Sequence, residues 1–469
     1  MSKHILNLLI LVLLQTGITP SLLFSTDSSF VIIGSVDLSG NRLTRSRTII
    51  RELPFQVGDS LPAGRLAKVV EEGRSNLMNT GLFNFVDAEI NDTNFPSVVI
   101  SYSFVERWNI WPLPVIELNE PNLNQWLKDP SFSTINYGFR LLLSNIGGYN
   151  ERVRILAKAG NVQSLDISMQ TPYFGKGLEF RAGIRYSLDR SESRAYATQD
   201  NEQVFVRTPG SFISREYIFG LNLDYRPGLY SIHRVSTRYN YNNYADTLMS
   251  LNPRFGPGGM NRFSFFMLGY TFLHDRRDIA TYPLDGYMVE AGIERKGLNF
   301  LGDSDMDVTT LTGGFRYYRP LGSGWYSAYS IKTRWSEGTT LSYFDQEGLG
   351  YSSSIIRGYE NKIVDGYKYL ILKGNIKYNI LPERRSEISF IPSKKFSLIH
   401  YALYLNFFID MGIMADRHFA ENNPLANKVL AGSGFGIDLH TYYDLVLRTE
   451  LTLNRHGSPG LFFHLLAPI

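Results

Sequence analysis

One arginine, Arg357, lies among residues that are unusual for a surface loop. Ile355 and Ile356 precede it, and Gly358 and Tyr359 follow it. A guanidinium keeps its positive charge inside a protein, so an arginine enclosed by apolar neighbours needs an anionic partner. Gly358 permits a close approach of the backbone, and Tyr359 offers packing area. The stretch therefore predicts recognition of a carboxylate through a two-pronged, charge-assisted contact.

The best candidate for that carboxylate is Asp410. Residues 401–412 alternate in character, with one face formed by Leu403, Leu405, Phe407 and Ile409 and the other by Asn406, Phe408 and Asp410. On a β-strand, alternation of this kind places the two sets on opposite faces of the sheet. If the loop around Arg357 folds inward, Arg357 can reach Asp410. On spacing alone, the alternative that both are ordinary solvated residues is equally open.

No pattern indicates an enzyme. The chain has no Cys, and it lacks G-x-S-x-G, H-E-x-x-H and P-loop sequences. Its 8 His residues show no metal-binding spacing. Asp303, Asp305 and Asp307 resemble the start of a calcium loop, but Val308 and Gly314 stand where such a loop needs Gly and Glu. We therefore expect no catalytic residue, no metal and no cofactor.

The composition and the N-terminus narrow the class of protein. The 469 residues include 41 Gly, 29 Tyr and 30 Phe, and the net charge is only +3, which favours strands and gives no indication of nucleic acid as a partner. Lys3 and His4 precede an apolar run at residues 5–14. This pattern is typical of a signal peptide, which we assign to residues 1–25, with a buried helix as the alternative. No later apolar run is long enough for a membrane helix.

Residues 30–107 predict a small α+β domain. The expected elements are a strand at 31–38, helices at 47–53 and 62–80, and strands at 86–90 and 98–105. The apolar face of the second helix is formed by Leu66, Val69, Val70, Gly73 and Leu77. Gly81 follows that helix at the position where glycine commonly ends one. A domain of this size can fold alone.

Residues 133–469 predict a transmembrane antiparallel β-barrel of sixteen strands, joined to the small domain by a linker at 108–132. In residues 445–454, for example, Leu445, Leu447, Leu451 and Leu453 oppose Arg448, Glu450 and Asn454. Strands with lipid outside and water inside alternate in this way, and they must close because lipid offers no hydrogen-bond partner. A soluble sandwich of two sheets is the alternative. The sixteen segments run from 133–144 to 459–468 and include 192–200 and 204–226.

The connections between these segments differ in length. Short turns such as 160–161 are expected at one end of the barrel and long loops such as 338–365 at the other. The first strand then starts beside the small domain, and the loop that carries Arg357 is external. Three tryptophans of the linker are interpreted either as an anchor at the membrane surface or as packing at the hinge: Trp108, Trp111 and Trp126.

Two short sequences resemble the signature motifs of the BamA/TamA outer-membrane assembly superfamily. "IIRGYENKIVDG" is similar to its loop motif, which Arg357, Gly358 and Tyr359 match. "FFIDMG" is similar to its strand motif, which Phe408, Asp410 and Gly412 match. "NLMNTGLFNFV" resembles part of a POTRA domain, and "DRRDIATYPLDG" resembles a turn of the family. The resemblance implies one periplasmic POTRA domain and a barrel of the bacterial surface antigen type in the bacterial outer membrane.

The chain departs from the family pattern at two places. Members often carry a glutamate near position 375, but this chain has Asn375, so Asp410 is expected to balance the charge of Arg357 alone. Many members end on an aromatic residue, whereas this chain ends Ala467-Pro468-Ile469. Pro468 lacks a donor, which would weaken pairing between the last strand and the first.

The resemblance implies that the protein assists assembly, insertion or translocation of proteins at the outer membrane. The seam between 133–144 and 459–468 would template an incoming strand by edge pairing, and the POTRA edge would receive unfolded or exported clients. The Arg357 loop would brace the lumen. A secretion pore for a dedicated partner protein is the alternative that a single POTRA domain favours, and a passive porin is a third. Outer-membrane lipid is an expected partner, and accessory lipoproteins are possible partners.

Overall fold

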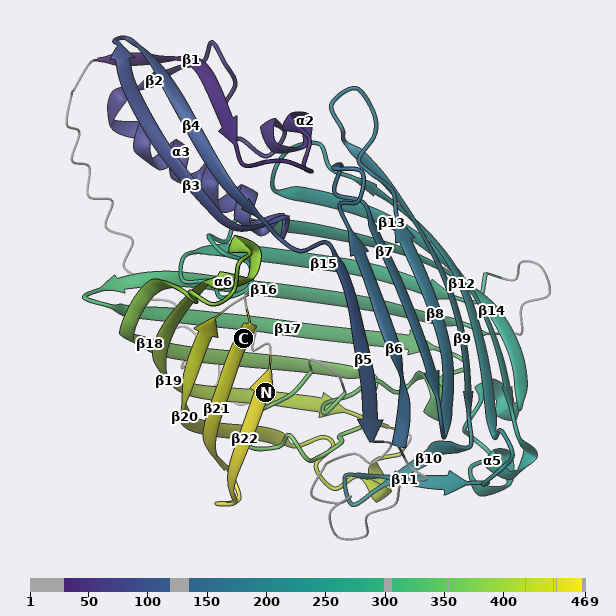
Figure 1. Cartoon of the computed structure of the whole chain (residues 1–469). Coiled ribbons are helices and arrows are strands. Elements are labelled where there is room, and N and C mark those ends of the chain that lie inside the picture. Colours follow the sequence, from purple (N-terminus) through teal and green to yellow (C-terminus); the bar gives the residue numbers. More distant parts are fainter. Residues whose placement is uncertain are drawn as a thin grey trace.

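The computed structural model describes residues 29–118, 135–298, 306–351, 354–417, 419–441, 443 and 445–465. A small domain lies against one end of a large curled sheet (Figure 1). The predicted signal peptide at residues 1–25 falls outside the described ranges. None of the helices in those ranges combines the length and the apolar character that a membrane crossing requires.

The small domain is a four-stranded sheet covered by helices. Its elements are β1 (Phe30–Ser39), α2 (Ser46–Ile50), β2 (Ser60–Pro62), α3 (Ala63–Asn79), β3 (Phe83–Asn94) and β4 (Ser97–Glu106). The strand order is β2-β1-β4-β3, with β1 parallel to β4 and the other pairs antiparallel. The predicted order of strands and helices is therefore confirmed, and the short strand β2 is an addition.

Helix α3 packs on this sheet through the face that its sequence predicts. Leu66, Val69, Val70, Gly73 and Leu77 are all buried, and each large side chain among them contributes about 1.5–3 kcal/mol by leaving water. Gly73 allows close packing, because a Cβ there would lie 2.6 Å from the hydroxyl oxygen of Tyr102 and would force that side chain to shift. Gly81 has a φ of +72° and follows the end of α3, as expected.

The large sheet has 16 strands, each antiparallel to its neighbours. They are β5 (Ile110–Leu118), β6 (Ile135–Ser144), β7 (Arg152–Ala159), β8 (Val162–Gln170), β9 (Phe180–Ser191), β12 (Ser214–Tyr225), β13 (Ser231–Tyr244), β14 (Arg262–Asp275), β15 (Gly286–Lys296), β16 (Val308–Gly322), β17 (Trp325–Gly338), β18 (Lys368–Glu387), β19 (Leu398–Ala415), β20 (Val429–Thr441), β21 (Leu445–Asn454) and β22 (Pro459–Leu465). The sheet curls into a barrel (Figure 1). The predicted fold class is therefore confirmed.

Three of the predicted strand assignments are wrong, although the count of sixteen barrel strands is right. The expected linker at 108–132 contains β5, which pairs with β6 and is the first barrel strand. The expected strand at 192–200 is instead β10 (Ser193–Gln199), which pairs with β11 (Glu202–Arg207) in a separate hairpin. The single strand expected at 204–226 is two strands, β11 and β12, and these belong to different sheets. Pro112 and Pro114 interrupt the usual strand composition in β5. Local alternation cannot show which sheet a segment such as β10 joins.

Because β5 was not expected, the directions predicted for β6 to β9 between the two ends of the barrel are reversed. The turn after β6 contacts the small domain, because the N–H of Arg45 donates to the carbonyl of Gly148 at 3.0 Å. The short turn at 160–161 is at the other end of β7 and therefore at the end of the long loops, contrary to the prediction. Beyond β11 the directions agree again, so the loop that carries Arg357 is at the loop end.

The two faces of the barrel strands differ as the alternation predicts. On β19, Ile409 is 62% exposed on the outer face, whereas Asp410 is fully buried on the inner one. Loop segments with short helices cover the loop end: α5 (Asp246–Leu251), η2 (Pro257–Gly259), η3 (Tyr343–Asp345) and η4 (Ala420–Asn422). At the domain end, α6 (Lys394–Ser397) precedes β19. The interior of the barrel, which we call the lumen, is thus lined by charged side chains, and loops with short helices lie at its loop end.

Candidate functional site

Arg357 lies inside the barrel, in the loop of residues 339–367 that connects β17 to β18. Its side chain is 5% exposed. The backbone N–H, Nε and Nη2 of Arg357 donate to the carboxylate of Asp410 at 3.1, 2.8 and 2.5 Å. The two residues predicted to meet are therefore in direct, two-pronged contact, and the loop that carries Arg357 folds inward from the loop end.

The guanidinium also binds two further strands. Its Nη1 donates to Oε1 of Glu450 on β21 at 3.1 Å, and its Nη2 donates to Oδ1 of Asn375 on β18 at 2.7 Å. The ring of Phe408 lies 3.8 Å below the guanidinium carbon, within cation–π range. The prediction that Asp410 balances the charge alone is wrong, because Glu450 supplies a second carboxylate.

Sequence alternation offered a signal for Glu450. It stands on the polar face of residues 445–454 beside Arg448, so its inward direction was predictable. Its meeting with Arg357 was not, because 93 positions separate the two residues. The pairing depends on strand register and on the path of the loop, which local sequence does not encode.

Glycines provide the space for the loop against the inner wall. Gly358 has a φ of +92°, which favours glycine. A Cβ at Gly432 of β20 would lie 1.8 Å from the carbonyl oxygen of Arg357, and one at Gly412 of β19 would lie 2.5 Å from Cδ1 of Ile356. The strand glycine of the predicted motif thus lets Ile356 pack, and Gly432 lets the Arg357 backbone approach the wall.

Tyr359 adds apolar packing next to the charged contact. It is 6% exposed and belongs to a cluster of buried residues that also contains Leu349, Ile356, Val364, Ile371, Met414 and Leu430. The cluster joins both arms of the loop to β18, β19 and β20. The six motif residues predicted from sequence therefore meet in one place, with the charge at the centre and apolar packing around it.

A second ionic contact continues toward the domain end. Nε and Nη2 of Arg448 donate to Asp438 at 2.7 and 2.8 Å. The hydroxyl of Tyr282, which comes from the turn between β14 and β15, donates to the same carboxylate at 2.8 Å. The ammonium of Lys377 lies 4.0 Å from the centre of the Tyr282 ring. Charged contacts therefore line the lumen from the inward-folded loop to a turn at the domain end.

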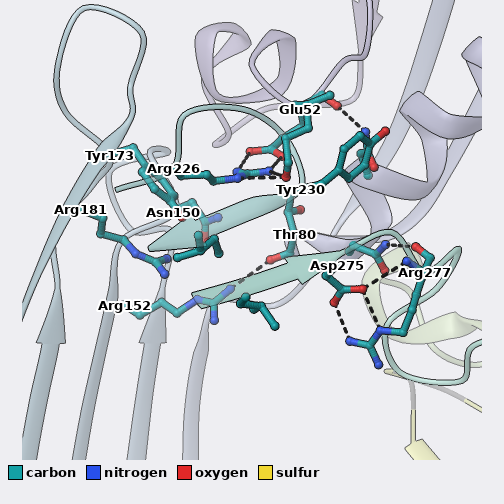
Figure 2. Close-up of a pocket in the computed structure, with 15 residues that line it drawn as sticks. Glu52, Thr80, Asn150, Arg152, Tyr173, Arg181, Arg226, Tyr230, Asp275 and Arg277 are labelled. Carbon is teal, nitrogen blue, oxygen red and sulfur yellow. Dashed lines mark hydrogen bonds and ion pairs between the residues drawn. The ribbon is translucent and has the colours of Figure 1, made fainter. Parts of the chain in front are cut away.

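The small domain is held to the barrel by a separate set of charged contacts (Figure 2). Nη1 and Nη2 of Arg226, on the turn after β12, donate to Glu52 at 2.8 and 2.7 Å. Burial alone would raise the pKa of Glu52, but the Arg226 and Arg51 guanidiniums outweigh burial and hold that pKa below its usual value. Tyr173 stacks with Arg51 and Arg181 at 4.3 and 4.7 Å. Four of these residues line a cavity of about 220 Å³: Glu52, Tyr173, Arg181 and Arg226.

The linker tryptophans pack at this junction. The ring centre of Trp108 lies 5.5 Å from that of Phe396 in α6, and Trp111 lies 5.0 Å from Tyr443. Of the two interpretations of this cluster, the contacts of these two residues support hinge packing. Trp126 lies outside the described ranges.

The first and last strands of the sheet, β5 and β22, share no ladder within the described residues; we call this boundary the seam. The N–H of Ser144 donates to the carbonyl of Asn109, so the odd-numbered residues of β5 make the hydrogen bonds to β6. The N–H and C=O groups of the even-numbered residues of β5 therefore point to the free edge. Pro112 and Pro114 fall on that edge and offer no donor. By the same alternation, Pro459 faces the free edge of β22. The predicted seam therefore lies at β5 rather than at 133–144.

Both parts of the chain match known protein families. Residues 31–107 match the family model "Surface antigen variable number repeat", POTRA, and residues 145–442 match the Omp85 superfamily domain. No curated protein matches the chain. Among solved structures, BamA from Haemophilus ducreyi lacking POTRA domains 1–3 is 14% identical with a TM-score of 0.48, covering 93% of this chain and 84% of its own. CdiB from Escherichia coli is 12% identical with a TM-score of 0.48, covering 96% and 92%.

Proposed function

This chain belongs to the Omp85 superfamily of outer-membrane barrels that insert or translocate proteins. We propose that it handles polypeptide at the seam, beside a wall of strands β18 to β21 that the Arg357 loop holds together. The loop end faces outside, and the POTRA domain lies in the periplasm. The single observation that carries this proposal is the buried Arg357, which joins β18, β19 and β21. A wall held in this way keeps its shape while the seam changes.

The free edges restrict which strand can receive a client. On β22, the N–H groups of Leu461, Phe463 and Leu465 point to the free edge in an unbroken series. On β5, the two prolines remove two donors from the corresponding edge. An incoming strand would therefore add to β22 more readily than to β5, by backbone hydrogen bonds of the kind that join peptides to sheet edges.

A second candidate function is secretion of one dedicated partner protein. The observation that favours it is the proline-bearing edge of β5, because prolines on an edge strand discourage pairing with another chain. In this mode the substrate passes through the lumen, and the loop must move away from the wall to let it pass. Glu52 and Arg226 then hold the POTRA domain at the entrance.

Depletion of the protein followed by outer-membrane and secreted proteomics separates these functions. Loss of many different barrel proteins supports insertion at the seam. Loss of one exported protein with other barrels unchanged supports the secretion mode. If only solute uptake changes, the protein is a passive pore and both proposals are wrong. A chain carrying Arg357→Ala should reproduce the depletion phenotype at normal protein level.

A further inference from the structure

Three potential metal ligands from different elements meet beside the Arg357 contact. Glu360 belongs to the loop, Glu450 to β21 and His464 to β22, and one ligand atom of each lies within 4.8 Å of the others. Nε2 of His464 is 3.4 Å from Oε2 of Glu450. Their positions in the sequence show no metal-binding spacing, so only the fold brings them together.

The ligand atoms in this cluster lack the partners that buried polar atoms normally have. Oε1 of Glu360 and Nε2 of His464 are buried and make no hydrogen bond, and such atoms are costly unless something satisfies them. The other oxygen of Glu360 accepts from the N–H of Gly358 at 2.7 Å. The other oxygen of Glu450 accepts from Arg357. Each carboxylate is therefore held through one oxygen, and the second oxygen of Glu450 faces Nε2 of His464 at 3.4 Å.

We propose that Glu360, Glu450 and His464 bind one Zn²⁺ ion. Zinc accepts imidazole nitrogen and carboxylate oxygen at about 2.0–2.2 Å, and sites with three protein ligands leave a fourth position for water. Tetrahedral ligands at such bond lengths lie about 3.3 Å apart, close to the spacing of His464 and Glu450. Calcium and magnesium prefer sets made only of oxygen ligands, so the histidine selects a transition metal.

The bound ion would connect the last strand to the inward loop. His464 is on β22, which has a ladder on one side only among the described strands. Arg357, which donates to Glu450, would orient that ligand as an outer-shell partner. Zinc would thereby hold the edge of β22 at the seam against β21 and the loop. The site goes beyond the proposed function because it does not depend on which protein the barrel handles.

The test uses the full chain, purified in detergent, treated with chelator and titrated with Zn²⁺ by calorimetry. We expect one ion per chain, and an affinity at least about tenfold weaker in Glu360→Gln and His464→Gln, since even loss of an outer-shell partner costs about 10–100-fold. His456→Gln is the matched control, because His456 lies near Tyr359 but outside the cluster. Its affinity should equal that of the unchanged chain.

Two further measurements test the ligand atoms and the effect of the ion on β22. Because the chain has no Cys, the optical spectrum of bound Co²⁺ should show nitrogen and oxygen ligands without thiolate bands. Hydrogen exchange at 461–465 should slow on addition of Zn²⁺ in the unchanged chain but not in folded His464→Gln. Absence of binding, or equal binding by His464→Gln, would overturn the proposal. A cluster that responds only to pH would show that His464 and the carboxylates share a proton instead.

Discussion

The wall formed by β18 to β21 and the seam between β5 and β22 differ sharply, although β21 of the wall pairs with β22 at the seam. Strands β18 and β19 contain 20 and 18 residues, whereas the described parts of β5 and β22 contain 9 and 7. The wall carries the buried ionic contacts of Arg357 on its inner face, and the seam carries prolines on its free edges. The difference indicates that stability is concentrated in the wall rather than in the two edge strands where the sheet can open.

The largest expected effect comes from breaking the wall. Arg357→Ala and Asp410→Ala should each lower the free energy of unfolding by about 3–5 kcal/mol, because each removes one partner of a buried, hydrogen-bonded ion pair. The double variant should be no less stable than either single one. Urea unfolding in detergent micelles measures these changes. Full additivity of the two effects would show that the residues do not act as a pair.

Arg185→Ala is the control for the single and double variants of Arg357 and Asp410. Arg185 also pairs with an aspartate, Asp166, at 2.7 Å, but its side chain is 49% exposed. The same kind of ion pair in water contributes less than about 1 kcal/mol. A loss at Arg185 as large as that at Arg357 would mean that burial does not distinguish the wall contact.

A substitution that adds a single carbon tests the fit of the loop against the wall. Gly432→Ala should lower stability by about 1–3 kcal/mol, as overpacking commonly does, because the new Cβ would meet the Arg357 carbonyl. Protease cleavage within 339–367 should increase at the same time. Gly374→Ala is the control, since its nearest contact would be an ordinary 3.9 Å. Equal behaviour of the two variants would contradict the docked position of the loop.

Backbone hydrogen-bond donors restored on β5 should strengthen pairing across the seam. In a chain with Pro112→Thr and Pro114→Thr, the two new N–H groups could pair across the seam and add up to about 2 kcal/mol. Amide exchange at 459–465 should then slow, and insertion or secretion should decline. Unchanged exchange would show that the free edges of β5 and β22 do not approach each other.

The smallest effect concerns pH at the junction of the two domains. Because the pKa of Glu52 is lowered in the folded protein, its contact with Arg226 stabilises docking fully above the usual carboxyl pKa of 4.5. This stabilisation is lost as the pH falls through the lower pKa that Glu52 has in the folded protein. Spin-label distances between the POTRA domain and the barrel should broaden in that range. Glu52→Gln should weaken docking by about 1 kcal/mol and remove the pH dependence. A distance that is insensitive to both would exclude this role.

Sequence reasoning predicted the wall better than the seam. Alternation and the need of an enclosed arginine for an anion named Arg357 and Asp410 as candidates, and the resemblance to two family motifs favoured their pairing over the solvated alternative. The role of Glu450 and its approach to Glu360 and His464 required strand register and the path of the loop, since Glu360 is distant in sequence from β21 and β22. Strand β5 was missed because Pro112 and Pro114 contradict strand composition, although prolines fit a free edge. The features that define the seam are thus those that make it hard to recognise.

The most direct test of the account is the accessibility of position 356, next to the arginine. Because the chain has no Cys, Ile356→Cys can be labelled selectively with a water-soluble maleimide in proteoliposomes. Ile356 is 1% exposed, whereas the nearby Asn361 is exposed. The account predicts that the Ile356→Cys variant stays unlabelled while the Asn361→Cys variant reacts, and that adding Arg357→Ala makes the thiol at position 356 react as well. Equal labelling of both positions in a chain that retains Arg357 would contradict it.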